Sequence, residues 1–105
     1  MRYLSTRGGI APVRFKDAVM MGLADDGGLL LPESIPVFSA AELESWRSLS
    51  YPQLAFEIIS RFVDDIPATE LQTLIDRSYA TFSHPEVTPV VQKDGVYILE
   101  LFHGV

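Results

Sequence analysis

The chain has 105 residues, of which 48% are apolar, and this length is enough for one domain with a modest core. Eight Lys and Arg residues face 14 Asp and Glu residues, and the net charge of −6 opposes binding to nucleic acid, which requires a positive surface. The absence of cysteine excludes disulfides and thiolate chemistry, and no apolar run approaches the roughly 18 residues of a membrane span. Because the first residues also do not resemble a signal peptide, the composition predicts a cytoplasmic protein without a membrane partner.

The N-terminal third is predicted to combine two short strands with one helix. Residues 3–5 form a strand candidate that the Thr-Arg-Gly-Gly segment at residues 6–9 ends. Apolar residues then recur at helical spacing from Phe15 to Leu23. The Asp-Asp-Gly-Gly segment at residues 25–28 is typical of a tight turn, and residues 29–31 follow it as a short buried strand that Pro32 ends.

Two capping boxes predict helix starts in the middle of the chain. In each box a serine oxygen accepts from the amide three residues on, and the Glu or Gln at that position returns to the serine amide. The two pairs are Ser39 with Glu42 and Ser50 with Gln53. The helix after Ser39 is expected to present Leu43 and Trp46 inward.

Two longer helices are predicted next to each other in the sequence. Apolar residues recur at i, i+3, i+4 and i+7 from Tyr51 to Phe62, and the same spacing follows Pro67 and continues to Phe82. Two apolar stripes joined by a short loop indicate an antiparallel helix pair.

The C-terminal part is predicted to be a β-hairpin. Residues 88–92 and 96–101 are β-rich runs, and the Asp-Gly pair between them is a strong turn signal. The order of strand, helix, strand, three helices and hairpin indicates an α+β fold. We expect a small domain with short strands, an antiparallel helix pair and a C-terminal β-hairpin.

Residues 6–9 offer one candidate anion site. Arg7 presents a planar fork suited to phosphate, Thr6 presents a hydroxyl, and the two glycines allow backbone amides to approach an anion. The alternative is a turn that ends the strand and carries a solvated arginine, and the residues alone favour this alternative.

Other chemistry finds little support in the sequence. The histidines, His84 and His103, are far apart and lack metal-ligand spacing, so no metal site is expected. His103 follows a strand and precedes a glycine, a position that fits either a site or a plain strand end. Lys16 and Lys93 are the lysines available for a Schiff base, and both are expected at the surface, without the desolvation that a catalytic lysine requires. No complete catalytic site is expected.

Four segments, taken in order, resemble the N-terminal domain of threonine synthase. The resemblance covers essentially the whole chain, and the ordered set is more specific than any single segment. The segments are Tyr-Leu-Ser-Thr-Arg-Gly at residues 3–8, residues 15–32, several motifs between residues 49 and 89, and Leu-Glu-Leu-Phe-His-Gly at residues 99–104.

The resemblance implies a pyridoxal 5′-phosphate (PLP) enzyme of the fold-type-II group, a carbon–oxygen lyase acting on phosphates. Such an enzyme converts O-phosphohomoserine and water to threonine and phosphate. In the family, Phe-His-Gly is followed by Pro-Thr and then by Phe-Lys-Asp, whose lysine holds the cofactor. That lysine would fall beyond Val105, which stands where the family has proline. Residues 1–95 are thus expected to form the N-terminal domain, and residues 96–105 the first strand leading into a catalytic domain outside this sequence.

Several expectations about the site follow from the resemblance. None of the family's catalytic residues matches a position in this chain, so the fragment alone is expected to bind no PLP and to be inactive. His103 and Gly104 are expected beside the cofactor site in a shaping role. Thr6 and Arg7 stay candidates for substrate phosphate.

The expected partners are the catalytic domain of the same polypeptide and O-phosphohomoserine. Two alternatives stay open. One is a fragment of a threonine-synthase-like phospholyase, which acts on hydroxyamino-acid phosphates. The other is a non-catalytic binding or assembly module, completed by a partner.

Overall fold

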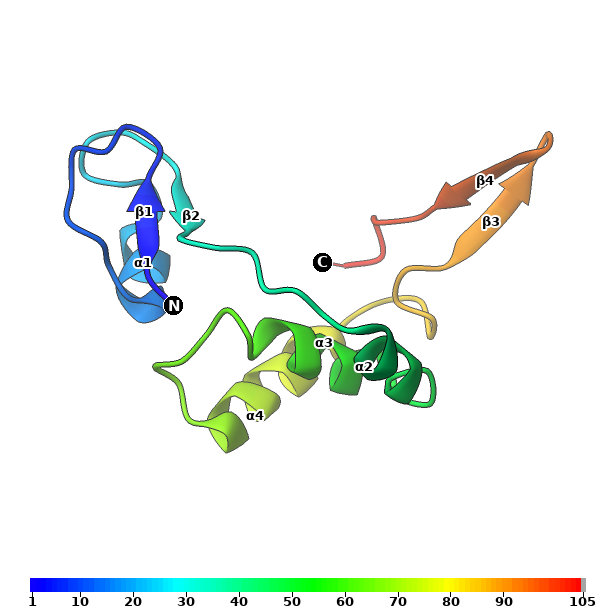
Figure 1. The fold of residues 1–105 in the computed structure, drawn as a ribbon. Coiled ribbons are helices and arrows are strands. Elements are labelled where there is room, and N and C mark those ends of the chain that lie inside the picture. The colour runs from blue at the N-terminus through cyan, green and yellow to red at the C-terminus, as the bar shows by residue number, and fades with distance from the viewer. Residues whose placement is uncertain (105) are drawn as a thin grey trace.

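The computed structural model describes residues 1–104, which form two antiparallel strand pairs and four helices (Figure 1). Val105, where the sequence departs from the family, lies outside the described residues. The α+β prediction is confirmed. In chain order the elements are β1 (Tyr3–Ser5), α1 (Phe15–Met21), β2 (Leu30–Pro32), α2 (Ala40–Ser45), α3 (Tyr51–Ile59), α4 (Ala68–Tyr79), β3 (Val90–Lys93) and β4 (Val96–Leu99).

The N-terminal unit consists of β1, α1 and β2. The strands pair antiparallel, with Leu4 opposite Leu31 at the centre. The prediction of a buried strand at residues 29–31 was wrong, because Leu31 is 53% exposed. A two-stranded sheet covered on one face leaves alternate side chains in solvent.

Both predicted capping boxes are present. The Ser39 hydroxyl accepts from the Glu42 amide at 3.1 Å, and the Glu42 carboxylate accepts from the Ser39 amide at 3.1 Å. Ser50 and Gln53 repeat the arrangement at the start of α3. Local hydrogen bonds therefore set both helix starts.

Helix α2 buries less than the sequence predicts. Trp46, directly after the helix, is buried and packs edge-on against Phe38 with ring centroids 5.2 Å apart. Leu43 was also predicted to face inward, but it is 54% exposed. A helix of six residues makes fewer than two turns, so it offers little apolar stripe to a core.

Helices α3 and α4 pack as the predicted antiparallel pair and hold the core, which consists of Ala55, Val63, Leu71 and Ile75. Both helices end three residues before the apolar spacing does. The amides of Phe62 and Phe82 donate to carbonyls three residues earlier, so each helix ends in a tighter, 3₁₀-like turn. This turn keeps the aromatic side chain near the helix pair.

The loop between α3 and α4 joins the helix pair to the N-terminal unit. The Tyr3 hydroxyl donates to the Phe62 carbonyl at 2.6 Å, and the Met1 ammonium lies 2.6 Å from the Asp64 carboxylate. That ammonium lowers the pKa of Asp64, and burial followed by the nearby acidic residues raises the pKa of the Tyr3 hydroxyl.

Asp65 in the same loop caps a helix that lies 49 residues away in sequence. Its carboxylate accepts from the Lys16 amide at 3.0 Å, in the first turn of α1, where Arg14 at the N-cap supplies no side-chain acceptor. The Asp65 side chain is 8% exposed. Asp65 therefore takes part in the packing of the domain and is not a solvated surface charge.

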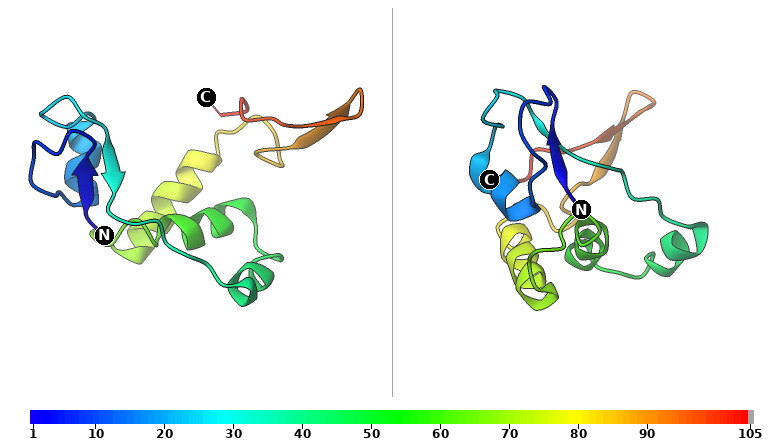
Figure 2. Two further views of the ribbon diagram at one scale, coloured as in Figure 1. Left: turned by 45° about the horizontal axis from the view of Figure 1, so that its top comes forward. Right: turned by 60° about the vertical axis from the view of Figure 1, so that its left-hand side comes forward.

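The described residues make an extended unit. Their Cα radius of gyration is 16.5 Å, whereas a compact domain of about 100 residues has about 13 Å. The β3–β4 ribbon projects away from the helices in every view (Figure 2). The accessible surface is 7474 Å², against about 5,900 Å² for a compact protein of this mass. Within residues 1–104, no helix is long and apolar enough to cross a membrane.

The buried core predicts a matched pair of stability effects. Ile75→Ala should lower the free energy of unfolding by about 2–4 kcal/mol, because the lost side chain is buried and leaves a cavity. Leu74→Ala, on the same helix but 44% exposed, should cost clearly less. Urea unfolding followed by circular dichroism measures both, and equal losses would contradict this description of the core.

Candidate functional site

Thr6 and Arg7 lie at the end of β1, against the turn at residues 25–28. The Thr6 hydroxyl accepts from the Leu29 amide at 2.9 Å, and the Thr6 amide donates to the Leu29 carbonyl at the same distance. The Arg7 guanidinium donates through Nη1 to the Asp26 carbonyl at 2.9 Å. Both candidate residues therefore hold the turn in place.

The Asp26 carboxylate is the centre of this contact. It accepts from the Ser5 hydroxyl at 2.7 and 2.8 Å, from the Gly9 amide at 2.7 Å and from the Gly28 amide at 2.9 Å. Chiefly through the Ser5 hydrogen bond, and then through the Gly28 amide, these donors hold the pKa of Asp26 below its ordinary value. Of the two glycines expected to approach an anion, Gly9 donates its amide to this carboxylate, whereas the Gly8 amide donates to the Ser5 carbonyl at 3.0 Å.

The close approach explains the glycines around the turn. A Cβ on Gly9 would lie 2.8 Å from Asp26 Oδ2, and a Cβ on Gly27 would lie 2.6 Å from Arg7 Nη1. Gly27 also has a φ of 84°, in the left-handed region that favours glycine. The role of Thr6 and Arg7 toward substrate phosphate stays a prediction.

The Asp26 contact predicts an acid-sensitive fold. Because its folded pKa lies below the unfolded value near 3.8, the carboxylate adds stability above that pH and loses it as the pH falls through the folded pKa. Asp26→Asn should unfold at lower urea than the parent at pH 7, and the difference should shrink below pH 3.8.

Asp25→Asn changes the neighbouring exposed residue in the same turn and is the matched control. It should leave the urea midpoint near that of the parent across this pH range. A constant difference between Asp26→Asn and the parent from pH 7 to pH 3 would contradict the role of the ionised carboxylate.

His103 and Gly104 contact the segment that follows α4. The His103 carbonyl accepts from both the Ser83 amide, at 2.9 Å, and the Ser83 hydroxyl, at 3.2 Å. A Cβ on Gly104 would lie 3.0 Å from the Phe82 ring, so the absence of a side chain permits this contact. Nε2 of His103 lies 2.9 Å from the Glu100 carboxylate, and the side chain is 15% exposed.

The fold brings the two histidines together although they are 19 residues apart in sequence. The rings of His84 and His103 have centroids 4.9 Å apart, and the His84 Nδ1 accepts from the Glu86 amide at 3.1 Å. Across residues 1–104, no group of three or more His, Asp or Glu side chains is arranged to hold a metal ion. Within that range, no hydrogen bond joins His103 or Gly104 to Thr6 or Arg7.

Ser83 is a contact that the sequence analysis missed, and it predicts a local effect. Ser83→Ala removes one of two hydrogen bonds to the His103 carbonyl, a loss worth about 0.5–1.5 kcal/mol. Chymotrypsin should then cleave after Phe102 roughly two- to tenfold faster.

Thr81→Ala is the control for the serine substitution. Its hydroxyl bonds within the same turn, to the Ser78 carbonyl at 3.1 Å, and the cleavage rate after Phe102 should stay near that of the parent. Equal acceleration in both variants would show that the Ser83 contact does not hold this segment.

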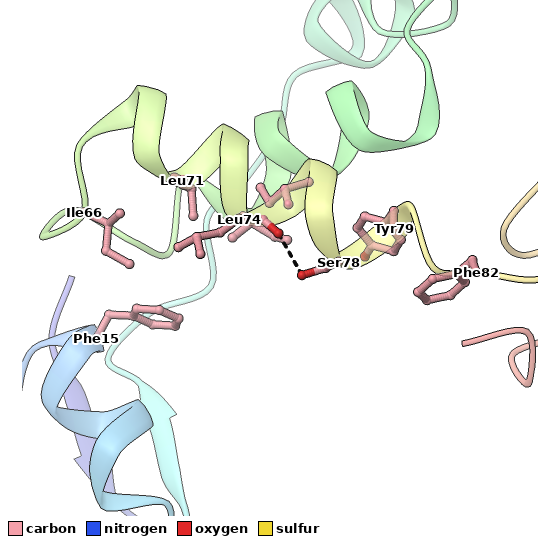
Figure 3. A pocket seen from close by; sticks show the side chains of 9 residues that line it. Phe15, Ile66, Leu71, Leu74, Ser78, Tyr79 and Phe82 are labelled. Carbon is pink, nitrogen blue, oxygen red and sulfur yellow. Dashed lines mark hydrogen bonds between the residues drawn. The ribbon is translucent and has the colours of Figure 1, made fainter. Parts of the chain in front are cut away.

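An open apolar groove of about 390 Å³ lies between α4 and the start of α1 (Figure 3). Phe15 and Ile66 lie at one end, Tyr79 and Phe82 at the other, and the remaining lining residues are Ile59, Leu71, Leu74, Ile75 and Ser78. The Ser78 hydroxyl bonds to the Leu74 carbonyl at 2.8 Å, so it is already paired. This groove fits apolar side chains better than a phosphorylated substrate.

The described residues do not fit PLP as a resident cofactor. Lys16 and Lys93 are both exposed, as predicted, and neither lines the groove at α4. Lys16 borders a second apolar cavity together with Val19 and Met20, and Met20 is 86% exposed. The fold and these surfaces define a small α+β domain with an open apolar groove beside its helix pair.

Comparison with known proteins gives the family. A family model described as "Threonine synthase N terminus" matches residues 2–79, so the chain belongs to the family of threonine synthase N-terminal domains. Threonine synthase from Schizosaccharomyces pombe is 50% identical over 97% of this chain, and threonine synthase-like 2 from Xenopus laevis is 43% identical over all of it.

A solved structure extends the match to the described fold. The PLP-bound threonine synthase from Brucella melitensis matches with a TM-score of 0.89 and 40% identity, over 100% of this chain and 23% of its own. The chain spans only 20% and 23% of the lengths of the S. pombe and X. laevis relatives.

Proposed function

We propose that this chain forms the N-terminal domain of a threonine synthase that converts O-phosphohomoserine and water to threonine and phosphate. The observation that carries the proposal is the likeness to the PLP-bound enzyme over the entire chain. The full-length protein would be a carbon–oxygen lyase. PLP would supply its chemistry, and polypeptide beyond the described residues would hold the cofactor. We expect the chain alone to bind no cofactor, to be inactive, and to reside in the cytoplasm with its full-length protein.

In this proposal residues 1–95 form the domain and residues 96–105 lead into the catalytic domain of the same polypeptide. The apolar groove at α4 supports such a partner, because it is open and lined mainly by apolar side chains. The proposed boundary falls directly after the Asp94-Gly95 turn, at the start of β4, so β3 and β4 would link the two parts.

The candidate residues would act by position. His103 and Gly104, held by Ser83 and Phe82, would shape the entry to the cofactor site. Within residues 1–104 Arg7 uses one of its five donors, at the Asp26 carbonyl, so its charge and remaining fork suit a substrate phosphate that reaches the outer side of this turn.

A phospholyase is the second candidate function. The chain is 43% identical to threonine synthase-like 2 and 50% identical to threonine synthase from S. pombe, so this domain occurs in proteins of both kinds. Similarity alone therefore favours the phospholyase nearly as well as the synthase. The phospholyase would release phosphate from hydroxyamino-acid phosphates instead of forming threonine. A binding or assembly module without catalysis is the remaining alternative.

One assay separates these functions. The full-length protein, supplied with PLP, should release phosphate from O-phosphohomoserine and form threonine. Phosphate release from O-phosphoserine or O-phosphothreonine without threonine formation would favour the phospholyase, and no turnover of any of these substrates would favour the module.

A variant of Arg7 tests its role toward phosphate in the same enzyme. Arg7→Lys keeps the positive charge but loses the planar fork of donors, and it should raise the KM for O-phosphohomoserine about tenfold or more if Arg7 binds phosphate.

The expected inactivity of the chain alone has its own test. The 105-residue chain is mixed with PLP, reduced with borohydride and digested for mass spectrometry. We expect no stoichiometric label at Lys16 or Lys93, because exposed lysines react weakly and without preference. A single, saturable label at either lysine would contradict this expectation.

A further inference from the structure

The β3–β4 ribbon is apolar on both faces, and both faces are open. All eight residues of the two strands are exposed, and Tyr97 is 72% exposed. Since side chains alternate along each strand, the register puts apolar residues on opposite faces: Val90, Tyr97 and Leu99 on one, and Val91, Val96 and Ile98 on the other. Sheets with one wet face alternate apolar and polar residues, whereas strands covered on both faces read as continuous apolar runs.

The sequences of the two strands differ: β4 has the composition of an internal strand of a sheet, and β3 has that of an edge strand. β4 is continuously apolar from Val96 to Leu99. β3 follows Pro89 and ends in Gln92 and Lys93. Proline and lysine are typical of edge strands, because they discourage pairing on the outer side.

The hydrogen-bond pattern shows which backbone groups face outward. The Glu100 amide donates to the Pro89 carbonyl at 2.9 Å, at a position that continues the register of the ribbon. In an antiparallel pair, bonded and non-bonded positions alternate, so Tyr97 and Leu99 direct their amides and carbonyls to the outer edge of β4. Val90 and Gln92 do the same on the outer edge of β3.

We propose that β4 pairs through this outer edge with a strand of the polypeptide that follows residue 104 in the full-length protein. β4 then becomes an internal strand of a sheet covered on both faces, and β3 becomes its edge strand. The inference rests on the proposed place of this chain at the start of a longer polypeptide, but not on the reaction.

Two observations favour this occupant. Relatives that match nearly the whole chain are four to five times as long, so polypeptide is available to cover the ribbon. The accessible surface exceeds that of a compact protein of this mass by about 1,600 Å², roughly twice what one partner contributes to a standard interface. A two-stranded ribbon is also marginally stable in water by itself.

Hydrogen exchange in the full-length protein tests the pairing without depending on activity. At single-residue resolution, the Tyr97 and Leu99 amides should exchange at least about tenfold more slowly than those of Val90 and Gln92. Fast exchange at all four amides, slow exchange at Val90 and Gln92 only, or equal slow exchange at all four would overturn the assignment. Loss of the protection on dilution would point to a second copy and would also overturn it.

Proline variants provide an independent check in the same protein. Leu99→Pro removes an outward amide from β4, whereas Val90→Pro removes the outward amide of its cross-strand partner on β3. Leu99→Pro should lower the thermal unfolding midpoint, and Val90→Pro should lower it much less. Equal shifts would overturn the inference. If the exchange pattern is found in a protein that forms no threonine, the proposed function fails while the pairing stands.

Discussion

The loop between α3 and α4 is the constraint on which the arrangement of this domain depends. Packing between elements occurs mainly within β1–β2, within α3–α4 and within β3–β4, so each pair is packed within itself but weakly joined to the next. Polar contacts from the loop join the first two pairs, through the Phe62 carbonyl and the carboxylates of Asp64 and Asp65. Small changes in this loop would therefore alter how the N-terminal unit meets the helix pair more than they would alter either part.

Asp26 and Asp65 perform the same physical task in different places. Each accepts backbone amides of a remote segment, Asp26 from Gly9 and Asp65 from Lys16. Gly9 lies in a loop and Lys16 in the first turn of α1, where neither a strand ladder nor the helix supplies a carbonyl acceptor. A carboxylate can accept from several donors at once, as Asp26 does from Ser5, Gly9 and Gly28, so one residue can hold separate segments together.

Elements with local causes could be predicted from the sequence, and long-range contacts could not. The capping boxes at Ser39 and Ser50 and the Asp94-Gly95 turn follow from residues within three positions, and the structure contains all of them. Other contacts join residues that lie 19 to 49 positions apart, and apolar periodicity carries no information about such pairs. They are the bond of Asp65 to Lys16, the bonds of Ser83 to His103 and the contact between the two histidine rings. At the candidate site, the sequence indicated Thr6, Arg7 and the glycines, but it did not indicate that the Asp26 carboxylate accepts from the Gly9 amide.

The exposed ribbon has a consequence for synthesis on the ribosome. In the proposed longer protein it leaves the exit tunnel before the strand that would cover it, so an apolar β-segment would stay uncovered while the chain grows. Such segments are prone to aggregate, and charged residues beside them slow that process. Lys93 and Asp94 at the turn and Glu100 just after β4 occupy such positions. Their charges would protect the nascent chain during this interval, a role separate from the stability of the finished protein.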